Sequence, residues 1–143
     1  MLKNYHYGIL IFNLLPIYPL DGGKLLNILL SLFFPFKRSI KITIYLSYIT
    51  IFLLVIINYP NIYLNLIIML IFLILTLQKE YKKIDQLYNK FLLERYLNHY
   101  HFSKSKIITN KDNFYRNRRH LIKEKGQYYL EDEYLAKKYK NFY

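Results

Sequence analysis

The stretch from residue 42 to residue 78 reads ITIYLSYITIFLLVIINYPNIYLNLIIMLIFLILTLQ and contains no charged side chain. A helix of about 20 apolar residues crosses a bilayer core of about 30 Å, and Tyr59-Pro60-Asn61 divides the run near its middle. We therefore predict two membrane-spanning helices, over residues 40–58 and 61–78, joined by a tight turn. A buried hairpin of a soluble protein would show a polar face on each helix, whereas the polar residues of this run are few and uncharged.

Charge is segregated along the 143-residue chain, which has a net charge of +12 although 54% of its residues are hydrophobic. Residues 1–78 hold five basic residues and one acid, and residues 79–143 hold sixteen basic residues and eight acids. Short basic flanks mark the cytoplasmic side of membrane helices. Because such flanks precede and follow the hairpin, we expect both its ends and the tail to be cytoplasmic. The flanks are Lys37, Arg38 and Lys41 before it and Lys79, Lys82 and Lys83 after it.

The segment from Tyr5 to Phe36 is also apolar, but Pro16, Pro19 and Gly22-Gly23 interrupt its helical pattern. Proline removes a backbone donor and pushes the preceding residue out of helical geometry, so we predict an unwound middle. Within a membrane, such backbone must pack against protein or line a wet cavity. A secretory signal peptide is the alternative, but no small-residue cleavage motif follows.

The whole chain is thus predicted to be an all-α integral membrane protein that crosses the membrane more than once. Its expected domains are a broken membrane segment over 1–36, a transmembrane hairpin over 37–78 and a basic, mostly helical cytoplasmic tail over 79–143. Membrane lipid is an expected partner. Since the chain has no cysteine, disulfides and thiolate ligands are excluded, and any metal must be held by His, Asp or Glu.

Asp21 is the only acid before Glu80 and lies almost midway along the broken segment. A carboxylate at the bilayer centre costs about 2.5–3.5 kcal/mol, so a residue of this kind is a functional candidate by default. The alternative is that Pro-Leu-Asp-Gly at residues 19–22 forms a surface β-turn, for example at the membrane edge.

The motif FNLLPIYPLDGGK, residues 12–24, resembles a signature of the site-2 proteases, which are intramembrane zinc metalloproteases. In that signature an Asn and two prolines lead into Leu-Asp-Gly on a broken transmembrane helix. The motif looks most like the branch that contains the stage IV sporulation protein FB. The matching residues are Asn13, Pro16, Pro19, Leu20, Asp21 and Gly22.

The resemblance implies a role for two of these residues. Asp21 would be the third protein ligand of a catalytic zinc, which uses three protein ligands and a water molecule. Asn13 would be an auxiliary residue whose amide holds the substrate or its oxyanion. The implied activity is cleavage of a membrane-associated peptide or protein substrate, which in the sporulation branch is a pro-sigma factor.

The other signature of this family, HExxH, is absent from the sequence. In that motif two histidines bind zinc and the glutamate acts as general base. The four histidines, His6, His99, His101 and His120, do not form such a motif. His99 and His101 are two residues apart and would not share a helix face, and His6 has no acid near it.

We therefore expect the chain alone to be inactive, with the HExxH ligands and base supplied by missing N-terminal helices or by another chain. The first hypothesis is the C-terminal part of a site-2-type protease. The second is a non-catalytic membrane protein, such as a decayed protease that acts as a scaffold. The third is a small basic membrane anchor.

The tail is predicted to begin with a helix over residues 79–100, followed by a polar linker over 103–113, a turn at Gly126 and a helix over 131–140. A basic cluster with aromatic neighbours, over residues 116–125, raises the possibility of nucleic-acid binding. A nearby anionic membrane leaflet explains the same charge, so no nucleic-acid partner is predicted. The first helix carries an apolar stripe, expected to pack within the chain or in self-association: Ile84, Leu87, Tyr88, Phe91, Leu92 and Tyr96.

Overall fold

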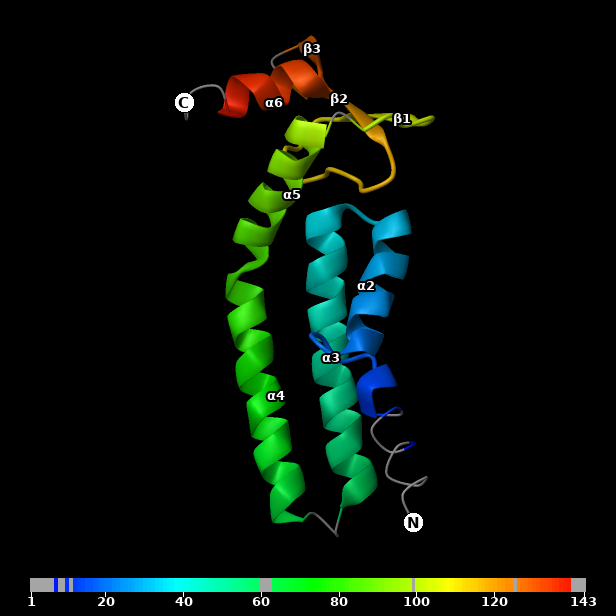
Figure 1. Cartoon of the computed structure of the whole chain (residues 1–143), viewed down its shortest axis with the longest axis vertical. Helices are drawn as coiled ribbons and strands as arrows, with labels where there is room; N and C mark the ends of the chain where they lie inside the picture. The colour runs from blue at the N-terminus through cyan, green and yellow to red at the C-terminus, as the bar shows by residue number, and fades with distance from the viewer. Residues whose placement is uncertain are drawn as a thin grey trace.

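The computed structural model describes residues 7, 10, 12–59, 63–98, 100–124 and 126–139. Figure 1 shows two long antiparallel helices, α3 and α4, with the shorter α2 beside α3. The helix α5 continues in the direction of α4 and leads to a small sheet and α6 at one end of the molecule. The elements are α2 (Asp21–Phe33), α3 (Phe36–Asn58), α4 (Leu64–Lys82), α5 (Ile84–Asn98), β1 (Ser105–Ile108), β2 (Arg119–Glu124), β3 (Gln127–Leu130) and α6 (Glu131–Tyr139).

The helices α3 and α4 occupy the uncharged run that opened the sequence analysis. Both are long and apolar enough to cross a membrane. Only 28% of the most apolar window of α3 and 17% of that of α4 are buried, so most of their apolar side chains form an outer surface. Helix α3 begins before residue 40, and α4 continues past residue 78. Of the predicted turn, Pro60 and Asn61 lie outside the described residues.

The helical pattern breaks at the two prolines, as predicted. Residues 12–14 are helical, residues 15–20 are not, and α2 begins at Asp21. The unwound backbone packs against α3: the Tyr18 N–H donates a hydrogen bond to Ser47 Oγ at 2.8 Å, and Ile17 is fully buried. Because Ser47 lies near the middle of α3, the break sits at half the length of that helix.

Close backbone packing explains the glycine pair at the start of α2. A Cβ atom at Gly22 would lie 2.2 Å from the Leu14 carbonyl oxygen, and one at Gly23 would lie 2.4 Å from the Tyr18 nitrogen. Neither position can hold a side chain without moving backbone. The chain therefore folds back on itself at the break so that the start of α2 touches residues 14–18.

The tail requires a correction to the all-α prediction. It contains a three-stranded sheet of order β1-β2-β3, in which β1 and β2 are parallel and β2 and β3 are antiparallel. The predicted linker over 103–113 includes β1, and much of the basic cluster lies on β2. Gly126, with φ of 85°, lies in the predicted turn between β2 and β3, and α6 follows as predicted.

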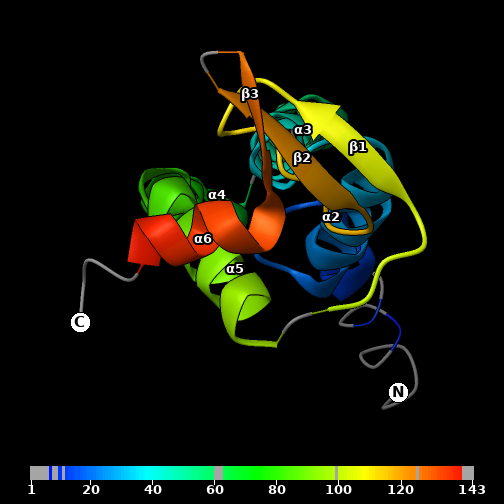
Figure 2. The same cartoon turned by 90° about the horizontal axis from the view of Figure 1, so that it is seen from above.

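The tail has its own hydrophobic core, between α5, α6 and the sheet. Figure 2 shows α6 crossing over α5, with the strands beside it. The apolar stripe of α5 supplies part of this core, which confirms the prediction of packing within the chain. The buried residues of the core are Tyr88, Phe91, Leu92, Ile108, Phe114, Ile122 and Leu135.

The tail docks directly onto the connection between α2 and α3, which we call the junction (residues 32–37). The Phe36 ring stacks on Phe91, with centroids 4.2 Å apart and planes 7° apart, and the Phe36 N–H donates to the Phe114 carbonyl oxygen at 2.8 Å. Asn117 Nδ2 donates to the Leu32 carbonyl oxygen at 3.5 Å. The junction thus ties the sheet domain to the helix that starts with Asp21.

Candidate functional site

Asp21 is the first residue of α2 and projects from the molecule. Its side chain is 74% exposed, and Oδ1 accepts a hydrogen bond from Lys24 Nζ at 3.1 Å. A carboxylate in the first turn of a helix is stabilised by the helix dipole. Apart from Lys24, the neighbouring exposed residues on α2 are apolar, including Leu25 and Leu29. An exposed carboxylate therefore lies within an apolar outer surface, at the level of the middle of α3.

Asn13 lies in the short helical stretch before the break and is half-buried. The contact of Gly22 with the carbonyls of Leu14 and Leu15 brings the backbone beside Asp21 against the backbone that follows Asn13. The fold thus brings together the backbone segments that neighbour the two predicted site residues. That the two side chains share one site stays a prediction.

The residues described do not make a complete zinc centre. Among them, no group of three or more His, Cys, Asp or Glu side chains could hold a metal ion. His101 is exposed in the tail and His120 is buried there, whereas His6 and His99 lie outside the described residues. Since a catalytic zinc needs three protein ligands, Asp21 alone does not fit this metal. The expectation of zinc comes from the resemblance to the site-2 proteases.

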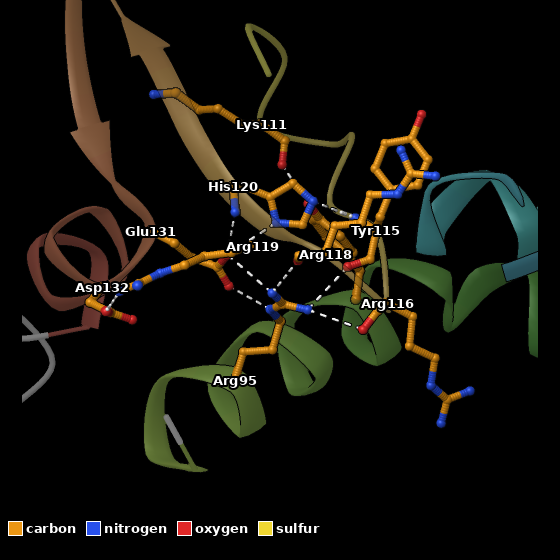
Figure 3. A network of polar contacts seen from close by, with 10 residues as sticks. Arg95, Lys111, Tyr115, Arg116, Arg118, Arg119, His120, Glu131 and Asp132 are labelled. Carbon is orange, nitrogen blue, oxygen red and sulfur yellow. Dashed lines mark hydrogen bonds and ion pairs between the residues drawn. The ribbon is translucent and has the colours of Figure 1, made fainter. Parts of the chain in front are cut away.

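The tail contains a buried polar network that the sequence analysis missed. Figure 3 shows the Arg95 guanidinium between the Glu131 carboxylate and the loop before β2. Arg95 Nε lies 2.5 Å from Glu131 Oε1, and Arg95 Nη2 lies 3.0 Å from Oε2. The same guanidinium donates to the carbonyl oxygens of Tyr115 and Arg118, at 3.0 and 2.7 Å. Arg95 therefore fixes the loop between β1 and β2 to α5 and α6.

His120 completes this network and is fully buried. Its Nε2 accepts a hydrogen bond from the Tyr115 N–H at 2.9 Å, and its Nδ1 lies 3.1 Å from Glu131 Oε2. This pattern fits a neutral imidazole with its proton on Nδ1. Both ring nitrogens are occupied and no solvent reaches them, so His120 is not placed to act as a general base. The network has a structural role.

Burial and hydrogen bonding set the charges in this network. Burial lowers the pKa of His120, although the hydrogen bond to Glu131 works in the opposite direction. For Glu131, burial alone would raise the pKa, but hydrogen bonds from His120 and Arg95 outweigh burial and lower it. The network therefore holds a carboxylate, a guanidinium and a neutral imidazole.

Sequence alone offered one weak signal for the network. His120 and Ile122 are buried and alternate with less buried residues along β2, a pattern typical of a half-buried strand. The partners of His120 are Tyr115 in the preceding loop and Glu131 of α6, and Arg95 joins the network from α5 through Glu131, so no local motif marks the whole set.

Comparison with known proteins supports a relationship in the region of the break. Residues 5–57 match the family described as Peptidase family M50. The stage IV sporulation protein FB of Bacillus subtilis (strain 168) is 38% identical to this chain over 95 residues, which are 64% of this chain and 33% of that protein. The chain thus spans about a third of the length of this curated relative. Residues 5–57 contain the break, Asp21, α2 and nearly all of α3, so the resemblance to Peptidase family M50, the site-2 proteases, covers this part of the chain.

Proposed function

We propose that this chain contributes the aspartate-bearing part of a site-2-type intramembrane zinc metalloprotease. The observation that carries the proposal is the position of Asp21: it starts α2 directly after the proline break, at the level of the middle of α3, within the M50 match. In this proposal Asp21 is one zinc ligand, and the HExxH histidines and glutamate come from residues outside this sequence. Asn13 holds the substrate beside it.

The membrane placement belongs to the same proposal. Helices α3 and α4 cross the bilayer, and the broken segment enters it. The proposal is supported by the length of both helices, by their largely unburied apolar surface and by the position of the basic flanks. The start of α3 and the end of α4, which carry these flanks, lie at the end of the molecule that holds the sheet (Figure 1). The tail would therefore be cytoplasmic.

The exposure of Asp21 supports the proposal that another protein helix covers this side of α2. An ionised carboxylate facing lipid near the bilayer centre costs about 2.5–3.5 kcal/mol, and polar groups at this depth face protein or a wet cavity. A helix that carries HExxH would cover the exposed side of α2 and supply the other ligands. The substrate would be a membrane-associated protein, and the likeness to a sporulation protein extends the proposal to a sporulation pro-sigma factor.

A non-catalytic scaffold is the second candidate. It is favoured by one observation, that the described residues lack a complete set of metal ligands. The two candidates differ in whether Asp21 can still act as a zinc ligand in an active protease.

A chimera tests the difference. Residues 5–57 of this chain replace the corresponding segment of the Bacillus subtilis stage IV sporulation protein FB, in a strain that lacks that protein. We expect the chimera to restore spore formation and Asp21→Ala to abolish it. The matched control is Lys24→Gln, which removes the ion-pair partner of Asp21 but leaves the carboxylate, and we expect this variant to retain activity. Equal spore counts with Asp21→Ala and with the unmodified chimera would refute the ligand role.

A further inference from the structure

A pocket of about 200 Å³ lies where the start of α3 meets the loop between β1 and β2. Three cationic side chains and two amides line it, together with one carboxylate. This pocket, which we call the basic pocket, is separate from Asp21 and from the buried network around His120. Its lining residues are Lys37, Arg38, Lys41, Asn110, Asp112 and Asn113.

The acids near the basic pocket are already engaged. Lys37 Nζ lies 2.8 Å from Asp85 and 3.2 Å from Asp112, so one cation takes up both carboxylates. Arg38 and Lys41 form no ion pair with any residue in the described part of the chain. Lys37 lowers the pKa of the Asp85 carboxyl most, and Lys41 is near enough to lower it further, but three cations share two carboxylates here, so the charge of the pocket favours an anion.

The surface below the basic pocket is apolar and lies on the same face of α3. Starting from Arg38 and Lys41, the steps of three or four residues that keep one face of a helix lead to Tyr45, Ile49, Phe52 and Ile56. All four of these side chains are exposed. A single helix face thus offers, at one end, two cations that form no ion pair with the described residues, and a continuous apolar strip along the rest.

We propose that the basic pocket binds the phosphate of an anionic phospholipid, whose acyl chains lie along this strip. Arg38 and Lys41 pair with the phosphate, and the Asn113 amide donates to a headgroup hydroxyl. The site rests on the proposed membrane placement of α3, which puts Arg38 and Lys41 at headgroup level, directly before the uncharged run. A free phosphate ion would use the cations but not the strip, so the strip favours lipid.

The test uses the full chain in nanodiscs of phosphatidylcholine with a minor fraction of phosphatidylglycerol. After extraction in mild detergent, native mass spectrometry counts the phosphatidylglycerol retained by each protein molecule. A basic residue near an anionic surface contributes about 1 kcal/mol, so we expect the double substitution Arg38→Gln/Lys41→Gln to lower retention by about tenfold or more. The matched control is Lys79→Gln/Lys82→Gln, which removes two charges at the end of α4, and we expect it to keep the lipid. Equal losses in the two double variants would overturn the site in favour of diffuse attraction.

A variant that leaves the charge unchanged distinguishes binding in the pocket from general attraction by the positive charge. Asn113→Leu leaves every charge in place but removes an amide from the lining, and we expect a several-fold loss of retained phosphatidylglycerol. Unchanged retention would exclude Asn113 and overturn the pocket geometry. Inorganic phosphate is the competing probe: we expect it not to displace the lipid, and displacement would assign the site to free phosphate. If the wild-type chain fails to enter nanodiscs at all, the proposed membrane placement is wrong. If it enters them but retains no phosphatidylglycerol, only the lipid site is wrong.

Discussion

Asp21 and His120 are ionisable side chains in opposite surroundings. Asp21 is exposed, with Lys24 as its neighbour, whereas His120 is buried with a partner at each ring nitrogen. An exposed carboxylate within an apolar surface is available to a metal or to another protein. A buried imidazole with both nitrogens engaged is not, so His120 contributes to the stability of the tail, whereas the role of Asp21 belongs to the proposed function.

The buried imidazole predicts a pH dependence for the stability of the tail. Burial lowers the pKa of His120 in the folded chain, so below its ordinary value of about 6.5 the unfolded chain binds a proton that the folded chain excludes. The free energy of unfolding should therefore fall as the pH drops through about 6.5, by at most about 1.4 kcal/mol per pH unit. Thermal unfolding followed by near-ultraviolet circular dichroism at a series of pH values measures this slope.

The matched variant for this prediction is His120→Asn, whose amide can donate to Glu131 but cannot titrate. We expect this variant to lose the slope that begins near pH 6.5. It should keep a second decline at lower pH, because the lowered pKa of Glu131 contributes stability that is lost as the pH falls below the usual glutamate value. A slope near pH 6.5 that His120→Asn leaves unchanged would assign it to another group.

At the scale of elements, the junction joins two parts of the fold through hydrogen bonds and through the aromatic ring of Phe36. Phe36 begins α3 and stacks on Phe91 of α5, so its removal should loosen the tail from the helices. Truncating a buried Phe costs about 3–5 kcal/mol, and the half-buried Phe36 should approach the lower end of that range. Hydrogen exchange of the amides of α5 measures the loosening, as faster exchange in Phe36→Ala.

Phe33→Ala is the matched control for this prediction. Phe33 ends α2, three residues before Phe36, but its side chain is largely exposed. We expect this variant to leave the exchange of α5 unchanged. Equal acceleration in the two variants would show that the ring stacking does not hold the tail in place.

The helices could be predicted from sequence because their signals are local. The uncharged run, its basic flanks and the proline break can each be seen in one contiguous stretch of sequence. The structure places α3, α4 and the break in those stretches. The apolar stripe of α5 also shows helical spacing. By contrast, β1 is a four-residue strand within a polar stretch, and its parallel pairing with β2 depends on residues more than ten positions away.

The candidate site could be predicted only as one short motif, with Asp21 and Asn13 as its candidate residues. The motif around Asp21 is contiguous, so its residues are visible together in the sequence. The path by which Gly22 packs against Leu14 and Leu15 depends on the geometry of the break and could not be read from spacing. The network of Arg95, His120 and Glu131 was missed because Arg95 lies 36 positions from Glu131 and because His120 falls within the stretch that the sequence analysis treated as a basic cluster.

For the whole molecule, the proposed membrane placement predicts which residues a water-soluble reagent can reach. The chain has no cysteine, so single cysteines can be introduced without a background. We expect Tyr59→Cys, at the end of α3 far from the tail, to react with a membrane-impermeant maleimide in intact cells. Lys104→Cys in the tail should react only after lysis, and Phe52→Cys in α3 should react in neither case. Reaction of Lys104→Cys in intact cells would reverse the proposed orientation.

In the proposed membrane placement, the hydrogen bond between the Tyr18 backbone N–H and Ser47 implies an order of events during synthesis. The two residues are 29 positions apart, so the ribosome completes the broken stretch well before it makes the partner of the Tyr18 amide. Lipid cannot satisfy that amide in the meantime. The nascent stretch must therefore wait in the translocon or against another protein until α3 arrives, and only then can it be released to its final place.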